Sequence, residues 1–451
     1  MEILFYILAV IVNIFIAVWI LQKYSIFSCP GLLVIFTLSY LLSDIAGLGL
    51  VALFNLSITP LPLEEEISLR VYPTFLHAIG FFLFALGLAI AFPKPLHKTK
   101  INIERKDLLK YLKRYGTFFV ILGLVMYFAS WATEGIYNLL TFYKEMYKYS
   151  YETKHYEFLI YGQNLVFIGF ALLAVSCRRR FSQLMMLAFA GIFGILFTAG
   201  KSGLWFATIT FFVALYIYRY HSFRYWFRPI LLFVLLCFLL VGLGIKTQLK
   251  YGEPGQQLEL SAESISTLAF AVVGSRWGPT GLYRGYSTLV ERLEENPWWH
   301  AKGEAIYFAS VAWIPRFLWS EKPLHPTKGL GYLVDPYGRI DPYGAEAPML
   351  VGTWIWDLGI MGVLFGTLIF GMLLGWISRY FVRANRFIKY APAYLFFVLS
   401  GISFAEGGFI NFLPNLTVVI AIMVGCVILI LLRSTARKVH IETKNIHHSV
   451  Y

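Results

Sequence analysis

Between Leu184 and Tyr218 the chain reads LMMLAFAGIFGILFTAGKSGLWFATITFFVALYIY, two apolar runs that meet at the polar turn Gly200-Lys201-Ser202-Gly203. A spanning helix needs roughly 17 to 25 mostly apolar residues to cross a hydrocarbon core of about 30 Å. If the stretch forms two spans joined by a tight turn, all later spans keep one orientation. If it forms one broken helix, all of them are inverted. This stretch therefore decides the topology of the whole chain.

The basic connections favour two spans at this point. Eleven apolar segments then qualify as spans, at roughly 3–22, 31–55, 72–92, 115–133, 158–176, 184–200, 203–219, 229–246, 350–377, 391–409 and 413–432. Lys and Arg concentrate in the connections 93–114, 178–180, 219–228 and 379–389 and in the tail after Leu432. With eleven spans all of these lie on one side, which the positive-inside rule makes cytoplasmic. We therefore expect the N-terminus outside and the C-terminus inside.

The composition is that of a polytopic membrane protein. The 451 residues are 58% hydrophobic and 18% aromatic, whereas an average soluble domain has about 45–50% apolar residues. The net charge of +13 comes mostly from short blocks beside apolar runs, so we do not expect nucleic-acid binding. The first apolar run lacks a basic leader and a small-residue cleavage site, which predicts a retained span. The cysteines, at 29, 177, 237 and 426, show neither a disulfide framework nor a zinc spacing.

The predicted fold is all-α, with about eleven transmembrane helices and one large extracytoplasmic loop. We divide the chain into about eight N-terminal spans (1–246), the long loop (247–349), about three C-terminal spans (350–432) and a cytoplasmic tail (433–451). On this topology the loop, the Lys201 turn and the turn at Glu406 share the outer face. Candidate functional residues therefore gather on one side of the membrane.

Two arginines of the long loop are candidate phosphate ligands. Arg276 follows an apolar stretch at 268–273 that we expect to dip into the membrane, and glycines from Gly274 to Gly285 favour irregular backbone around it. Such backbone is tolerated at membrane depth only where protein or a wet cavity surrounds it. This context would aim Arg276 and Arg284 at a cavity. The alternative is that both side chains extend to phospholipid headgroups.

More cations follow in the motif IPRFLWSEKP at 314–323, which carries Arg316 and Lys322, with Lys328 six residues further on. A guanidinium group binds phosphate oxygens in pairs and lysine adds a mobile charge, so these residues could neutralise a pyrophosphate leaving group. The alternative is an ordinary polar loop whose tryptophans are interface anchors. A charge at bilayer depth is costly, which makes Lys201 a functional candidate unless it extends to the outer interface.

Glu406, in SFAEGGF at 403–409, is our first candidate for a general base. A carboxylate among apolar residues at the outer end of a span is suited to take a proton from a sugar hydroxyl. The alternative is that Glu406 is the counter-ion of a nearby arginine. Glu346, just before a span, and Asp357, about two turns inside that span, are the other candidate bases.

The remaining polar residues favour structural roles. His77 and Asp44 lie inside spans, where interhelical hydrogen bonds are the usual function of such side chains. His300 and His325 are isolated loop histidines that we expect to be solvated. The run Glu64-Glu65-Glu66 is the acidic cluster that could hold a divalent ion. Consecutive residues on a helix point in different directions, so no metal is required.

These motifs resemble the bacterial O-antigen and oligosaccharide repeat-unit polymerases, the Wzy family, and the length and layout are similar to those of enterobacterial common antigen polymerases. The resemblance covers roughly 184–420. The segments that carry it are GKS at 200–202, SRW at 275–277, IPRFLWSEKP at 314–323, the stretch 348–362 and AEG at 405–407. Lys201 stands where relatives often have arginine, and it lacks the bidentate grip of that residue.

The resemblance implies a GT-C-like glycosyltransferase of the bacterial inner membrane with its active site facing the periplasm. It would transfer a glycan from undecaprenyl pyrophosphate to a lipid-linked repeat unit without nucleotide sugar, cofactor or metal, and with a Wzz-type chain-length regulator as a possible partner. No carboxylate pair is placed for a covalent intermediate, which predicts inversion. The alternatives are an O-antigen ligase and a flippase for the same lipid. A flippase needs polar residues along the full membrane depth.

Overall fold

The computed structural model describes residues 2–54, 61–92, 105–132, 156–177, 179–197, 201–218, 282–311, 314, 319, 321, 323, 348–383 and 386–448. Every regular element in these ranges is a helix, which confirms the all-α class. Within the described ranges, six segments are long and apolar enough to cross a membrane: Glu2–Lys23, Cys29–Gly49, Leu63–Ala91, Leu108–Ala129, Met349–Val382 and Ala391–Leu431. The chain is therefore polytopic, as its composition predicts. The predicted span at 229–246 lies outside the described residues.

The N-terminal helices are α1 (Glu2–Lys23), α2 (Cys29–Phe54), α3 (Leu63–Ala91), α4 (Arg105–Ala132), α7 (Tyr156–Ser176), α8 (Arg180–Phe197) and α9 (Lys201–Tyr218). The long-loop region contributes α13 (Leu282–Glu295), the 3₁₀ turn η3 (Pro297–Trp299) and α14 (Glu304–Val311). The C-terminal helices are α16 (Met349–Met361), the π-helical η4 (Gly362–Gly366), α17 (Thr367–Val382), α18 (Arg386–Lys389), α19 (Ala391–Gly407), the 3₁₀ turn η6 (Gly408–Asn411) and α20 (Phe412–His448). The decisive stretch around Lys201 thus forms two helices, α8 and α9.

Helix directions agree with the alternation that eleven spans require. Asn13 of α1 contacts Thr74 of α3, and Tyr24, directly after α1, contacts Leu88 and Phe92 further along, so α1 and α3 run parallel. In the same way Gly80 lies against Val363 and Gly87 against Leu368, which makes α3 parallel to the η4–α17 segment. The first, third and ninth predicted spans therefore share one direction.

Small residues allow two of these helices to approach closely. In α4, Gly116 faces Gly169 of α7 and Gly123 faces Gly162, so the pair is antiparallel. A Cβ built on Gly123 would lie 2.6 Å from the carbonyl oxygen of Gly162. Glycine at helix interfaces is the usual basis of tight packing in membranes, where the lipid tails are as apolar as the side chains.

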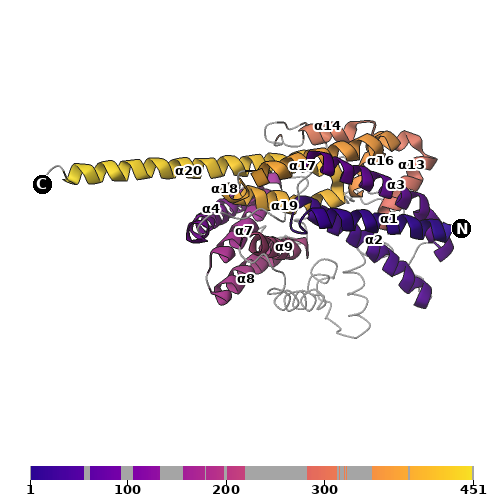
Figure 1. Cartoon of the computed structure of the whole chain (residues 1–451), viewed down its shortest axis with the longest axis horizontal. Helices are drawn as coiled ribbons and strands as arrows, with labels where there is room; N and C mark the ends of the chain where they lie inside the picture. Colours follow the sequence, from indigo (N-terminus) through magenta and orange to yellow (C-terminus); the bar gives the residue numbers. More distant parts are fainter. Residues whose placement is uncertain are drawn as a thin grey trace.

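The two ends of the bundle differ in chemistry. At one end, tyrosine hydroxyls tie α4 and α9 to α18: Tyr115 donates to the Lys389 carbonyl at 3.0 Å and Tyr218 to the Phe387 carbonyl at 2.9 Å. From this end α20 projects beyond the other described helices (Figure 1). The opposite end holds the N-terminus and α13 (Figure 1), together with nearly all the buried charges described below.

Candidate functional site

Glu406 lies in the last turn of α19 at the end of the bundle that holds α13. Its carboxylate is half-buried, and Oε1 accepts a hydrogen bond from the Tyr40 hydroxyl of α2 at 2.9 Å. The chain turns directly after it because Gly408 adopts φ +55°, a conformation that favours glycine, and packs against Thr353 of α16. The favoured base is therefore held between three helices.

A buried ionic network lies one helical turn further along α2. Arg70 of α3 binds Asp44 of α2 through two hydrogen bonds, from Nε at 2.7 Å and from Nη2 at 2.9 Å. The Nη1 atom of Arg70 donates to both the carboxylate and the main-chain carbonyl of Glu66. Tyr40 and Asp44 are four residues apart, so they share one face of α2. The network and the Tyr40–Glu406 pair are thus neighbours.

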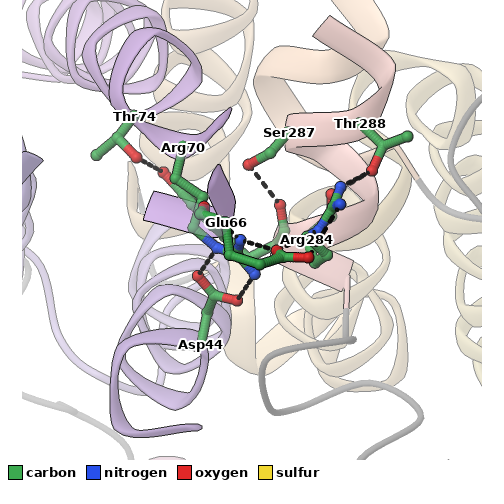
Figure 2. A network of polar contacts seen from close by, with 8 residues as sticks. Asp44, Glu66, Arg70, Thr74, Arg284, Ser287 and Thr288 are labelled. Atoms are coloured by element: carbon green, nitrogen blue, oxygen red, sulfur yellow. Dashed lines mark hydrogen bonds and ion pairs between the residues drawn. The ribbon is translucent and has the colours of Figure 1, made fainter. Parts of the chain in front are cut away.

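Arg284 completes the network from α13 (Figure 2). Its Nε donates to Glu66 Oε2 at 2.7 Å and its Nη2 to Oε1 at 3.3 Å, while Nη1 donates to the Thr288 hydroxyl. Burial lowers the pKa of Arg284, and the Glu66 carboxylate opposes this change. Arginine nevertheless stays protonated in proteins. The long-loop region is therefore anchored to the transmembrane helices by a charge pair.

The four charged side chains of this network are almost completely shielded from solvent. The exposed fraction is 0% for Asp44, Glu66 and Arg70 and 2% for Arg284. Two carboxylates and two guanidinium groups sum to zero formal charge. Burying ions is tolerated only when each is paired and hydrogen-bonded, as these are.

A stripe of polar residues continues from the network along α3 into the bundle. Thr74 accepts a hydrogen bond from the Tyr283 hydroxyl at 2.9 Å, and His77 Nδ1 lies 2.7 Å from Asn13 Oδ1. From Glu66 to His77 the stripe covers about 16 Å of helix at 1.5 Å per residue. Beyond His77 the same face is apolar, with Phe81 buried. The expected interhelical hydrogen bonds of Asp44 and His77 are confirmed.

Asp357 has a structural task in this arrangement. Its carboxylate accepts hydrogen bonds from the main-chain N–H groups of Gly303, Ala305 and Ile306, at 3.0, 3.1 and 3.2 Å. These N–H groups belong to the first turn of α14 and the residue before it, and such groups have no partner within the helix itself. Asp357 thus caps a helix of the long-loop region.

The segment before α14 also closes a break in the membrane helix. Gly359 has φ +63° and ψ −149°, which interrupts α16. The Trp356 carbonyl accepts a hydrogen bond from the Ala301 N–H at 2.9 Å and lies 3.1 Å from His300 Nδ1. Irregular backbone at membrane depth needs such partners from neighbouring protein. His300, expected to be a solvated loop residue, instead contacts this helix.

The other predicted phosphate ligands are not placed by the structure. Arg276, Arg316, Lys322, Lys328 and the candidate base Glu346 lie outside the described residues, as does His325. Lys201 begins α9, and its side chain is not among those described. Of the predicted phosphate ligands the structure therefore places the side chain of Arg284, and of the candidate bases those of Glu406 and Asp357.

Sequence reasoning missed Tyr40 and the pairing of Glu66 with Arg70. The four-residue spacing of Glu66 and Arg70 on one helix could have indicated their pairing. No sequence pattern indicates a role for Tyr40. The side chains of the run Glu64-Glu65-Glu66 point in different directions, as helix geometry requires: Glu64 and Glu65 are exposed and Glu66 is buried. No group of three or more His, Cys, Asp or Glu side chains among the described residues is arranged to hold a metal ion.

Comparisons with known proteins do not assign the chain to a family. No protein-family model matches the chain, and neither the curated proteins nor the solved structures contain a match.

Proposed function

We propose that the protein is a membrane glycosyltransferase that polymerises undecaprenyl-pyrophosphate-linked oligosaccharide repeat units at the outer face of the bacterial inner membrane. The observation that carries the proposal is the half-buried carboxylate of Glu406, held by Tyr40 at the end of the bundle where the long-loop region docks. A base at this end can meet a sugar whose lipid tail stays in the bilayer. The sequence resemblance supplies the substrate class.

In the proposed reaction Glu406 takes the proton of an acceptor hydroxyl on the incoming repeat unit. The hydroxyl oxygen attacks the anomeric carbon of the donor glycan, and the bond from that carbon to the pyrophosphate oxygen breaks. Undecaprenyl pyrophosphate leaves with the bonding electron pair. A single displacement of this kind inverts the anomeric configuration.

Cations of the outer face neutralise the leaving pyrophosphate in this proposal. We assign this role to Arg276, Arg316 and Lys322, with Lys201 and Lys328 in support, because phosphate binding by several cations stabilises the developing charge. Arg284 is given a different role, since its guanidinium already binds Glu66 and Thr288. It positions α13, and with it the loop that carries the other cations. Glu346 is the second candidate base.

The polar stripe on α3 favours transfer at one face over transport across the membrane. A flippase for a glycan needs polar groups along the whole depth of the bilayer. In the described part of the bundle the stripe ends at His77, and the next residues on that face, Phe81 and Phe84, are buried and apolar. This arrangement suits a protein whose chemistry is confined to one membrane surface.

The test is elongation by purified protein in lipid nanodiscs supplied with a lipid-linked repeat unit. We expect a ladder of longer glycans without added nucleotide sugar or metal, and we expect Glu406→Gln to lower the rate by about 100-fold, the usual contribution of a general base. Glu64→Gln, an exposed carboxylate at the same end, is the matched control.

Two outcomes would contradict the proposal. An absolute requirement for nucleotide sugar would reject the lipid-linked donor. Transfer of a finished glycan to another acceptor, with no ladder on the lipid, would identify a ligase instead.

A further inference from the structure

We propose that Tyr40 is a positioning residue for the transfer reaction, because its hydroxyl fixes the orientation in which the Glu406 carboxylate receives the acceptor proton. This inference rests on the proposed function. No sequence feature points to Tyr40, and its role follows from geometry alone. The hydroxyl donates to Oε1 of Glu406 at 2.9 Å across 366 residues of sequence.

Tyr40 is suited to hold another side chain still. Its ring is 1% exposed and belongs to the hydrophobic core, so its position is fixed by packing. A tyrosine has only two side-chain torsions, whereas glutamate has three and samples more orientations. The rigid phenol therefore restricts the more flexible carboxylate.

The helix that carries Tyr40 is itself fixed on both sides of this residue. One turn further on, Asp44 is bound by two hydrogen bonds from Arg70. Towards the start of α2, the backbone touches α19 directly: a Cβ on Gly401 would lie 2.3 Å from the Cys29 carbonyl oxygen. Tyr40 and Glu406 thus project from two helices, α2 and α19, whose backbones are in direct contact.

Orientation matters because a general base works only within hydrogen-bond reach of the proton it removes. A displacement of about 1 Å can lower the rate by about 100-fold. Without the Tyr40 hydroxyl the carboxylate loses the contact that holds Oε1, and its orientation towards the acceptor sugar changes. The loss would affect the chemical step and leave substrate affinity intact.

The experiment compares Tyr40→Phe with wild type in the elongation assay. We expect kcat to fall between about 10- and 100-fold with KM unchanged within about twofold. Tyr24→Phe is the matched control, because Tyr24 is equally buried and donates to the carbonyls of Leu88 and Phe92 at the other end of the bundle. It should retain wild-type kcat. Replacing Tyr40 with 3-fluorotyrosine keeps the hydroxyl and should restore most of the lost rate.

Several results would overturn the inference. The first is a Tyr40→Phe rate within about twofold of wild type. The second is an equal loss of rate in Tyr24→Phe, which would indicate a general packing defect. The third is no recovery of the rate with 3-fluorotyrosine. Failure of wild-type protein to elongate would reject the proposed function instead. In that case infrared difference spectra against Glu406→Gln still test the contact without substrate. The Glu406 carboxylate band should shift in Tyr40→Phe, and an unchanged band would show that the hydroxyl does not hold this group.

Discussion

Each charged residue of the buried network depends on a partner from another position in the chain. Asp44 neutralises Arg70, and its two oxygens accept two of the hydrogen bonds that this guanidinium donates. We expect Asp44→Asn to lower the free energy of unfolding by about 3–5 kcal/mol, because the buried guanidinium groups of Arg70 and Arg284 would then share the single carboxylate of Glu66. Thermal unfolding of the protein in detergent measures this change. Glu64→Gln, on the exposed face of α3, should be neutral, and equal stability of the two variants would contradict the prediction.

Asp357 acts on α14 from a different helix. Asparagine in its place offers one acceptor oxygen instead of two, and neutral acceptors form weaker bonds than a carboxylate. We expect Asp357→Asn to cost about 1–2 kcal/mol, the typical value of a helix cap. Hydrogen exchange at the amides of Gly303, Ala305 and Ile306 should then become faster. Glu304→Gln, an exposed residue of the same helix, is the control.

Some of these residue roles could be predicted from the sequence and others could not. A polar side chain inside an apolar span must find a partner, so the hydrogen bonds of Asp44 and His77 followed from position alone. Arg284 was expected to face phosphate, but its carboxylate partner lies 218 residues away in the chain. Such long-range pairs leave no local pattern, and Tyr40 with Glu406 is the more extreme case.

At the scale of elements, helix pairs depend on backbone contact at glycine. We expect Gly123→Leu to destabilise the protein by about 3 kcal/mol or more, because the side chain would have to push α4 and α7 apart. Gly49→Leu is the matched control, since nothing lies within 4 Å of a Cβ at that position. Folded yield in detergent, measured by size-exclusion chromatography, should fall for the first variant alone. Equal yields would show that the close approach of α4 and α7 is not required.

The six described apolar segments of spanning length were predictable because hydrophobic length is a local property. The interruption at Gly359 was not, since apolar residues continue on both sides of it and the Trp356 carbonyl finds its partners at residues 300–301. The helix α13 was also missed within a segment expected to be a loop. Its buried face includes Arg284, whose carboxylate partner on α3 is not revealed by composition.

At the scale of the whole molecule, the predicted orientation can be tested directly. With the native cysteines replaced, a cysteine at Glu64 should react with a membrane-impermeant maleimide in cells with a permeable outer envelope. A cysteine at Arg383 should react only after the inner membrane is opened. Both positions are exposed and lie at opposite ends of the bundle. The reverse labelling pattern would place the candidate base in the cytoplasm and exclude the proposed reaction there.

The formal charges of the buried network add up to zero, and this has an electrical consequence. An unpaired charge that crosses the membrane field exchanges about 2.3 kcal/mol per 100 mV with it. Asp44, Glu66, Arg70 and Arg284 carry equal numbers of both signs, so a rigid displacement of this group in the field involves no net work. An energised cell and a de-energised vesicle would therefore present the same arrangement of these four side chains.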